Sequence, residues 1–515
     1  MSSIAFSDLP PGRTPGIQRG NRILRLLPPL FAAVLVVAGI GLSGRAAAQA
    51  PRPYRAAVHV HSNFSSGEFS VNKLAKMAEE DGLSILVLTD HARLSMTWGV
   101  YPIQNVLRVR QERRSVFQAG VGRYLAAVAE ANRAHPKVLI IPGIEAAAHY
   151  HFSGDPFKKN LVAHNWRRHM HILGLNRPED FLSLPVAGGV SPNLLLDRGA
   201  SAFPRTVWPY LFSAIYGFGV LIGILFMFRR GFRRFLGFLI FVAFVPLAVN
   251  ELPVVKPPSD PYGGDPGILP YQALINAAVK KGGVVLWAHQ GSLLNKQNLG
   301  PVTLETDPNP DVLIESTGYT AFDAIYEDNF VASKPGRQWD RVLGEYIQNK
   351  RKTPVWAYGG VDYHNKKEIR SRKRLSDIQT VFLLKKRSKM EVLTALQEGR
   401  MYVVRGYGPA RLRLDRFEVI SRDRNLMALS GETLTTNTPS EIRFRISASD
   451  DSTRDLTVQL IRNGKVIRTF KGKTPLEMRH VDTESLKGKT VYYRLDAQVS
   501  RSAHLITNPI FVKRQ

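Results

Sequence analysis

The sequence predicts an α/β domain that is interrupted by a pair of apolar helices and followed by a strand-rich domain. Short apolar runs alternate with helical patterns before residue 174 and again after residue 270, as in parallel α/β folds. Two long apolar stretches lie between these parts, and beyond residue 406 short alternating strands are separated by turn residues. We therefore expect a targeting segment at 1–50, the two parts of the α/β domain at 51–207 and 256–405, a helical hairpin at 208–255 and a β-domain at 406–515.

The composition limits the chemistry of any site. The chain has 515 residues, enough for two or three domains, and no cysteine. A transition metal would therefore have to be held by His, Asp and Glu. The net charge of +28 would suit either nucleic acid or an anionic lipid surface. Because no nucleic-acid module or glycine-rich phosphate loop is recognisable, we expect a membrane partner and no nucleic acid.

The N-terminal segment has the pattern of a signal peptide. Four arginines (Arg13, Arg19, Arg22 and Arg25) precede an apolar run from Leu30 to Leu42, and small residues follow up to Ala50. The interpretation is an exported protein, with an uncleaved anchor as the alternative.

The α/β elements can be placed from periodicity. In the first part we expect strands at 56–61, 84–89, 138–141 and 169–173, with helices at 71–82 and 105–134. In the second part we expect strands at 283–288, 312–315, 355–360 and 401–404, with helices at 270–281, 337–349 and 390–398.

The interruption has the pattern of a transmembrane hairpin. Residues 209–228 are apolar over a length that can cross a bilayer, and a second run covers 235–249 with a possible extension to 255. The turn between the runs, 229–234, holds four arginines, which the positive-inside rule places in the cytoplasm. The alternative is two buried helices of a soluble core. With an exported N-terminus, the hairpin puts the α/β domain on the periplasmic side of a bacterial-type inner membrane.

The C-terminal segment is predicted to form an antiparallel β-sandwich that serves as an accessory domain. Strands are expected at 441–447, 457–462, 466–470 and 491–499, with Asn463-Gly464 as a hairpin turn. The basic tracts 366–374 and 385–387 are interpreted as solvated faces, with contact to lipid headgroups or an anionic substrate as the alternative.

Candidate metal ligands lie within or just after the predicted strands of the α/β domain. Because the carboxyl ends of parallel strands share one edge of a sheet, we expect these side chains to converge. They are His59, His61, Asp90, His91, Glu145, His171, His289, Asp362 and His364.

These motifs, in this order, resemble the polymerase-and-histidinol-phosphatase (PHP) family of metal-dependent hydrolases. The matching stretches are His59-x-His61 with Ser62-x-x-Ser65-x-Gly67, Thr89-Asp90-His91, Gly143-Ile144-Glu145, His171, Ala288-His289 and 359–364 (GGVDYH). The leader, the catalytic domain and the strand-rich tail ending at 505–509 also resemble the branch that contains carbamate hydrolases. The resemblance implies a distorted (β/α)7 barrel with two or three divalent ions such as zinc, manganese or iron.

The resemblance also assigns ligands. It implies that His59, His61, Glu145 and Asp362 hold one metal, and that Glu145 bridges to a second metal held by His171 and His289. A third metal would be held by His91 and His364, although Gly67 stands where some family members supply a further histidine. Asp90 is expected to orient a ligand, with direct contact to metal as the alternative.

The predicted activity is hydrolysis of a phosphate ester, either a small molecule or a lipid headgroup. Glu145, Asp362, His289 and Asp90 are the candidate catalytic residues. A carbamate or amide hydrolase on the same centre is one alternative, and a non-catalytic membrane module with a structural metal is another. His149, His151, His164 and His169 are expected to shape the pocket, to donate a proton or to lie on the surface, and Arg93 is a candidate anion clamp.

Overall fold

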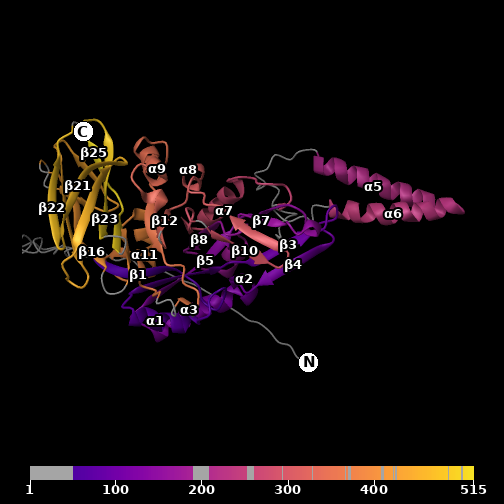
Figure 1. Ribbon diagram of the computed structural model, residues 1–515, viewed down its shortest axis with the longest axis horizontal. Coiled ribbons are helices and arrows are strands. Elements are labelled where there is room, and N and C mark those ends of the chain that lie inside the picture. The colour runs from indigo at the N-terminus through magenta and orange to yellow at the C-terminus, as the bar shows by residue number, and fades with distance from the viewer. Residues whose placement is uncertain are drawn as a thin grey trace, which may run out of the picture. The chain divides into compact units, whose positions relative to one another are not determined.

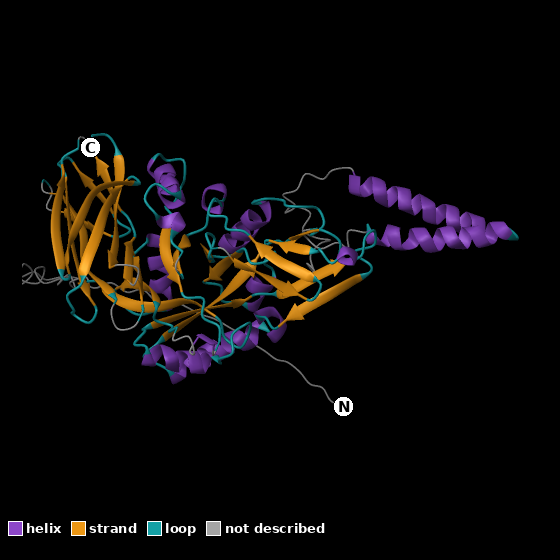
Figure 2. Cartoon of the chain, viewed as in Figure 1, coloured by secondary structure: helices purple, strands orange, loops and turns teal. Residues whose placement is uncertain are grey.

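The computed structural model describes residues 50–188, 208–251 and 260–515, apart from short loop positions. Those positions are 293, 328, 366, 369–372, 408–410, 422, 424–425, 485–486 and 500–502. Pro51–Gln515 form one compact unit (Figures 1 and 2). The predicted targeting segment 1–50 lies outside the described residues except for Ala50, as do positions 252–255 of the hairpin and much of the basic tract 366–374.

The α/β part is built on one series of adjacent strands in the order β13–β12–β9–β8–β5–β2–β1. In chain order these are β1 (Arg52–Val60), β2 (Ile85–His91), β5 (Leu139–Ala147), β8 (His169–Leu173), β9 (Val284–Trp287), β12 (Ala321–Tyr326) and β13 (Trp356–Gly360). The chain just after β13 returns to β1 at the other end of the series, because His61 N donates to Tyr363 O (2.9 Å) and Val361 N to Val58 O (2.9 Å). The first and last strands of the series are therefore joined through the backbone.

Strand β8 departs from the expected parallel arrangement. The pairs β1–β2, β2–β5, β9–β12 and β12–β13 are parallel, whereas β8 is antiparallel to both β5 and β9. Histidines at the beginning of β8 consequently lie beside residues at the ends of its neighbours.

Amphipathic helices cover the strands. The longer ones are α1 (Val71–Glu80), α3 (Val121–Ala134), α7 (Leu269–Lys280), α9 (Gln338–Ile347) and α11 (Lys389–Glu398), and short helical turns lie at α4 (Pro178–Leu182), η1 (Pro156–Lys158) and η2 (Val331–Ser333). In α1 the Ser70 side chain caps the first turn by accepting from Lys73 N, and Leu74, Ala75 and Ala78 are buried. These five helices confirm the predictions at 71–82, 270–281, 337–349 and 390–398 and the second half of the prediction at 105–134.

Two predicted elements are wrong. Residues 105–115 are not helical: β4 (Arg108–Arg113) pairs with β3 (Leu94–Gly99), and helix resumes only at α2 (Val116–Ala119). The apolar run at 312–315 is a helical turn, α8 (Val312–Glu315), and the strand is β12, which follows it. A run of four apolar residues cannot distinguish a buried strand from a buried helical turn.

A small sheet lies beside this part of the fold. Its strand order is β10 (Leu294–Leu299), β11 (Val302–Thr306), β7 (Val162–His164) and β6 (His151–Ser153). A separate apolar cluster, which includes Met96, Tyr150, Phe152 and Leu304, packs it against the β3–β4 ribbon.

The C-terminal region is rich in strands and continues the main sheet. From β1 the sheet runs through β14 (Ile378–Leu384), β15 (Met401–Gly406), β24 (Ala503–Thr507), β23 (Thr490–Val499), β20 (Asp455–Arg462) and β21 (Lys465–Lys473). β25 (Ile510–Arg514) pairs with β23 and β18 (Thr433–Thr436), and a second sheet runs β17 (Leu426–Leu429), β16 (Leu412–Ser421), β19 (Ser440–Ala448) and β22 (Leu476–Asp482). Residues of both sheets share one hydrophobic core. Asn463 (φ 49°) and Gly464 (φ 79°) form the predicted hairpin turn.

Two apolar helices, α5 (Trp208–Met227) and α6 (Phe232–Asn250), pack closely against each other (Figure 1). Glycines permit the approach, since a Cβ on Gly223 would lie 2.7 Å from Phe241 N and one on Gly237 would lie 2.6 Å from Met227 N. Within the described residues, α6 alone is long and apolar enough to cross a membrane, and 6% of that stretch is buried. The apolar part of α5, Leu211–Met227, is shorter.

Candidate metal centre

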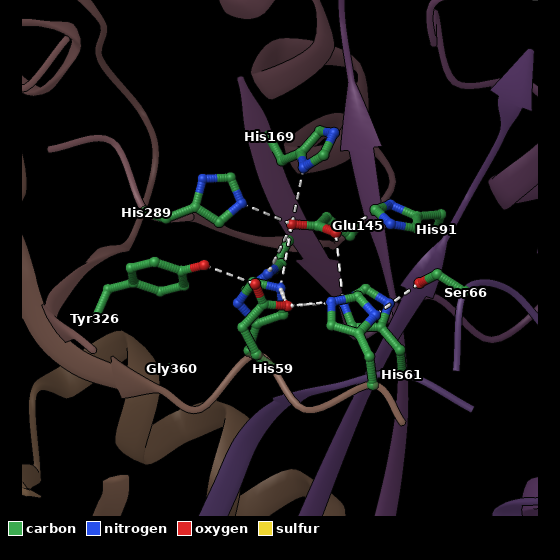
Figure 3. Close-up of polar contacts among 12 residues, drawn as sticks. His59, His61, Ser66, His91, Glu145, His169, His289, Tyr326 and Gly360 are labelled. Atoms are coloured by element: carbon green, nitrogen blue, oxygen red, sulfur yellow. Dashed lines mark hydrogen bonds and ion pairs between the residues drawn. The ribbon is translucent and has the colours of Figure 1, made fainter. Parts of the chain in front are cut away.

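Glu145, near the end of β5 and 2% exposed, is the centre of a group of histidines. Figure 3 shows its carboxylate between His289 and His91, with His169 on a third side. The nitrogen-to-oxygen distances to Glu145 Oε1 are 3.0 Å from His169, 3.1 Å from His289, 3.2 Å from His59 and 3.7 Å from His171; those to Oε2 are 3.0 Å from His91 and 3.5 Å from His61. One buried carboxylate thus contacts six imidazoles.

Asp362 supplies a second carboxylate to the same group. Its Oδ1 lies 3.1 Å from His59 Nε2, 3.3 Å from His61 Nε2 and 2.7 Å from His364 Nε2. The Tyr326 hydroxyl donates to Oδ2 (2.8 Å) and so fixes the orientation of the carboxylate.

Three of the predicted ligands have an unusual backbone conformation. His59, His289 and Asp362 have φ angles of 71°, 33° and 46°, in the left-handed region that non-glycine residues rarely occupy. At His59 the pairing of β1 with β2 also shifts register between Val58 and Val60. Such conformations cost about 1–3 kcal/mol each and cluster at functional sites, where the surrounding structure maintains them.

The donor set fits divalent metal ions. Four groups have ligand atoms that all lie within 4.8 Å of one another: His59–His61–Asp362, His59–Glu145–His171, His61–His91–Glu145 and Glu145–His169–His289. The Nε2 atoms of His59, His61 and His171 are buried without a hydrogen-bond partner. An unsatisfied buried polar atom costs about 1–3 kcal/mol, a penalty that coordination to a cation would remove. Imidazole with carboxylate suits zinc, manganese and iron.

The electrostatics also suit metal binding. Burial raises the pKa of Glu145, but His169, His59 and His91 outweigh it and bring the pKa well below its usual value. Burial lowers the pKa of His169 to about 4 and that of His171 to about 3. At neutral pH the carboxylate is therefore charged and these two imidazoles are neutral, which is the state that metal ligation requires.

Asp90 does not belong to any of the four ligand groups of the described residues. It is fully buried, and it accepts hydrogen bonds from Ser62 N (2.8 Å), Ser62 Oγ (2.8 Å) and Ser65 Oγ (2.6 Å). Ser65 Oγ also lies 3.4 Å from His61 Nδ1. The carboxylate thus holds the loop after β1 and, through Ser65, contacts the ring of His61. Its role in orienting a metal ligand stays a prediction.

His91 and His364, the expected ligands of a third metal, do not fall in the same ligand group of the described residues. Their ring centroids lie 6.4 Å apart, and His91 is grouped with His61 and Glu145 instead. His364 stacks on His61 (4.1 Å between centroids), and its Nδ1 lies 2.9 Å from Ser66 Oγ.

Sequence reasoning missed two participants. His169 was expected to shape the pocket, to donate a proton or to lie on the surface, but it contacts Glu145 beside His289. Its spacing to His171 repeats the His59-x-His61 signal, so the pattern could have identified it. Tyr326, at the end of β12, had no local signal.

A cleft of about 520 Å³ opens onto the metal ligands. Its lining includes His91, Glu145, His169, His289, Tyr326, Asp362 and His364, the polar residues Ser66, Gln111, Arg113, Arg167, Gln297 and Asn365, and the apolar residues Leu94, Met96, Trp166, Leu299 and Leu304. Arg113 and Arg167 are therefore the arginines of the cleft lining.

Other predicted pocket residues lie elsewhere. Arg93 is not part of the cleft lining, because its guanidinium lies over the Phe117 ring (5.6 Å) and 3.9 Å from Glu112. His149, His151 and His164 are also absent from the lining. Their rings stack in sequence, with centroid distances of 6.1 and 4.9 Å, and His149 is 1% exposed.

Fold and site together define an α/β domain with a candidate metal centre made of histidines and carboxylates. Residues 57–179 match the family model of the PHP domain. The chain therefore carries a PHP domain, and the match contains His59, His61, Asp90, His91, Glu145, His169 and His171.

No curated protein matches the chain. Among solved structures, it is similar to a two-domain protein from Bacteroides vulgatus that contains a predicted PHP-like metal-dependent phosphoesterase (12% identity, TM-score 0.35, covering 88% of this chain and 92% of that one). It is also similar to a candidate metal-dependent phosphoesterase from Bifidobacterium adolescentis (18%, TM-score 0.27, 61% and 90%) and to an amidohydrolase from Chromobacterium violaceum with bound sulfate and no metal (12%, TM-score 0.26, 61% and 88%). At these TM-scores the likenesses add nothing to the assignment, which rests on the family match and the site.

Proposed function

We propose that this protein is a membrane-tethered, metal-dependent phosphoesterase that acts on the non-cytoplasmic side of a bacterial-type inner membrane. The observation that carries the proposal is the buried Glu145 carboxylate, which belongs to three of the four ligand groups. Glu145 lies at the edge of the sheet where β1, β2 and β9 also end. This edge is where α/β folds bind their ligands.

Two or three divalent ions of zinc, manganese or iron would be held by the four ligand groups. His59, His61 and Asp362 make one set, and Glu145 is common to the sets that include His171, His91 and His169 with His289. Ions bound there would supply a water of lowered pKa and would polarise the bond that is broken. The candidate catalytic residues Glu145, Asp362 and His289 act by holding them, and Asp90 acts by positioning His61 through Ser65.

The cleft favours a phosphate ester as substrate. Arg113 and Arg167 line it together with the metal ligands, and guanidinium groups bind phosphate oxygens through paired, charge-assisted hydrogen bonds. A neutral carbamate has no anionic group for these arginines to bind. We therefore place phosphate esters ahead of carbamates and amides.

The proposal extends to the closure of the main sheet and to the placement of the apolar helices in the membrane. We infer that the strands from β1 to β13 close into the distorted (β/α)7 barrel, supported by the hydrogen bonds between residues 361–363 and β1. We also infer that α5 and α6 span the bilayer. Their 20 and 19 residues correspond to about 30 and 28 Å of helix, which matches a hydrocarbon core of about 30 Å.

The test uses the full-length protein purified in detergent. Bound metals are measured, and phosphomonoesters, phosphodiesters and carbamates are screened with the wild type, with Glu145→Gln and with His289→Ala. Glu79→Gln is the matched control, because Glu79 also contacts a histidine (His135, 3.2 Å) but lies on α1, outside the ligand groups. The expected result is metal-dependent turnover of a phosphate ester that both site variants lose and the control keeps.

Equal or absent turnover in all proteins, with manganese, zinc and iron each supplied, would overturn the enzymatic proposal. Turnover of carbamates alone would overturn the choice of substrate. Topology is tested separately with a reporter inserted within 229–234, which should report the cytoplasm; a reporter signal from the outer side would overturn the hairpin assignment.

A further inference from the structure

We infer that the substrate is a phosphate ester carried by a membrane lipid, and that it reaches the cleft along the β3–β4 ribbon. The ribbon consists of β3 (Leu94–Gly99), β4 (Arg108–Arg113) and the connecting turn 100–107. The inference rests on the proposed phosphoesterase function and specifies the class of its substrate.

One face of the ribbon runs from the cleft outward. The directly paired residues are Leu94 with Arg113, Met96 with Gln111 and Trp98 with Val109. Alternate residues of a strand share a face, so these three pairs form a single track. The first two pairs line the cleft. The third pair extends the same face toward the turn.

The outer end of this track is apolar and exposed. The exposed fractions are 84% for Tyr101, 57% for Leu107, 47% for Val109 and 42% for Val106. Exposed apolar residues gathered on one turn mark an interaction site, and tyrosine is enriched where proteins meet the membrane interface.

Hydrogen bonds tie the turn to the end of the apolar hairpin. Asn105 N donates to Asn250 Oδ1 (2.8 Å), Asn105 Nδ2 donates to Asn250 O (3.4 Å), and both residues are buried. Asn250 is the last residue of α6, about 28 Å of helix away from the arginine-containing turn 229–234. If that turn lies at the cytoplasmic surface, Asn250 and the ribbon turn lie at the outer surface of the bilayer.

The charge of the ribbon complements a phospholipid surface. The ribbon, residues 94–113, contains three arginines (Arg108, Arg110 and Arg113) and a single acidic residue, Glu112. Each basic residue near an anionic membrane contributes about 1 kcal/mol of attraction. Arg113 belongs both to this basic segment and to the cleft lining, so it would meet the phosphate where the track enters the site.

The cleft itself suits a lipid. Beside the arginines its wall includes Leu94, Met96, Leu299 and Leu304. An apolar wall next to phosphate-binding groups would contact the chains nearest a lipid headgroup. A fully polar sugar phosphate would leave this wall without a partner.

The first test compares two kinds of ester. The full-length protein is reconstituted in vesicles of phosphatidylcholine with phosphatidylglycerol and phosphatidic acid, and release of headgroup or phosphate is measured beside hydrolysis of p-nitrophenyl phosphate and its bis ester in solution. Leu107→Asp tests the turn, and Val466→Asp is the control, because Val466 is similarly exposed (40%) on β21. The expected result is that Leu107→Asp lowers lipid turnover at least about tenfold, leaves soluble-ester turnover unchanged, and that the control alters neither.

The outcomes separate the two proposals. Hydrolysis of soluble esters without lipid turnover, or equal lipid turnover by Leu107→Asp and the control, would overturn the lipid inference and leave the phosphoesterase function intact. Absence of turnover on every ester would overturn the proposed function, and the lipid substrate with it.

A second test does not depend on activity. Because the chain contains no cysteine, Leu107→Cys introduces a single thiol for an environment-sensitive fluorophore, and Met390→Cys (78% exposed, on α11) is the matched control. In vesicles that contain brominated phosphatidylcholine, the label at 107 should be quenched at least about twofold more than the label at 390. Equal quenching at the two positions would overturn the membrane contact of the ribbon.

Discussion

The substitution Glu145→Gln is the most informative perturbation of the site. Glutamine keeps the size and shape of the side chain but removes its charge and one metal-binding oxygen. Three of the four ligand groups contain Glu145, so each of these would retain two protein ligands, while His59–His61–Asp362 would remain complete. We expect the variant to lose most of its bound metal and its hydrolytic activity.

The size of the effect follows from the burial of the carboxylate. Glu145 is 2% exposed, and removal of one partner from a buried charge pair costs about 3–5 kcal/mol. At 1.4 kcal/mol per power of ten, the dissociation constant of the metal should rise by about two to three and a half powers of ten. A metal concentration 1,000 times the wild-type Kd stabilises the wild type by about 4 kcal/mol; for a 1,000-fold weaker site the same concentration gives less than about 0.5 kcal/mol.

The assay is thermal unfolding of the full-length protein in detergent, with and without added manganese, zinc or iron. The quantity compared is the metal-dependent gain in stability of each variant. Because it is measured against the same variant without metal, it does not include any effect of the substitution on the metal-free protein. Glu79→Gln should keep the wild-type increment. Equal increments for Glu145→Gln and the wild type, with equal metal content, would refute the placement of the metals around Glu145.

Two further substitutions test neighbouring parts of the structure. Tyr326→Phe removes the hydroxyl that donates to Asp362 (2.8 Å) and should weaken metal binding about 10- to 100-fold without loss of fold, as a metal titration would detect; unchanged affinity would exclude the orienting role. In the strand-rich region, burial raises the pKa of Asp482, but hydrogen bonds from Tyr493 and Arg462 bring it below its usual value. Because the folded-state pKa is the lower one, this stabilisation is present above about pH 4 and is lost as the pH falls through the folded-state value. Asp482→Asn should therefore cost about 1–3 kcal/mol at pH 7 and progressively less below pH 4; a cost independent of pH in thermal unfolding would contradict it.

Much of the candidate site could be predicted because its residues follow apolar runs that are visible in the sequence. His59, His61, His91, Glu145, His289 and Asp362 all lie at or just after the end of a strand, and the structure brings them to the same two carboxylates. His169 was missed as a ligand because it was grouped with His149, His151 and His164 and not with His171, which lies on the same strand. An antiparallel strand presents the residues at its beginning, and in β8 these are His169 and His171.

Features that depend on pairing over long distances could not be predicted from local patterns. The stretch at 108–113 is rich in arginine and suggests the polar face of a helix, yet it is a strand because β3 supplies its hydrogen bonds. In β12, Asp323 interrupts an apolar run, and its burial is compensated by Gly360 N, which donates to its Oδ1 (2.9 Å). Residue 405 was expected to end the α/β domain, yet the main sheet continues through β15 into β24; the domain boundary stays a prediction.

The central claim is that a multinuclear metal site centred on Glu145 hydrolyses phosphate esters. Its most direct test is to strip the full-length wild-type protein with a chelator, reload it with manganese, zinc or iron, and measure bound ions per chain together with phosphate release. The account predicts that stripping abolishes phosphate release and that one of these metals restores it as two or three ions bind. Phosphate release that survives complete stripping, or a reloaded protein that binds less than one ion per chain, would contradict it.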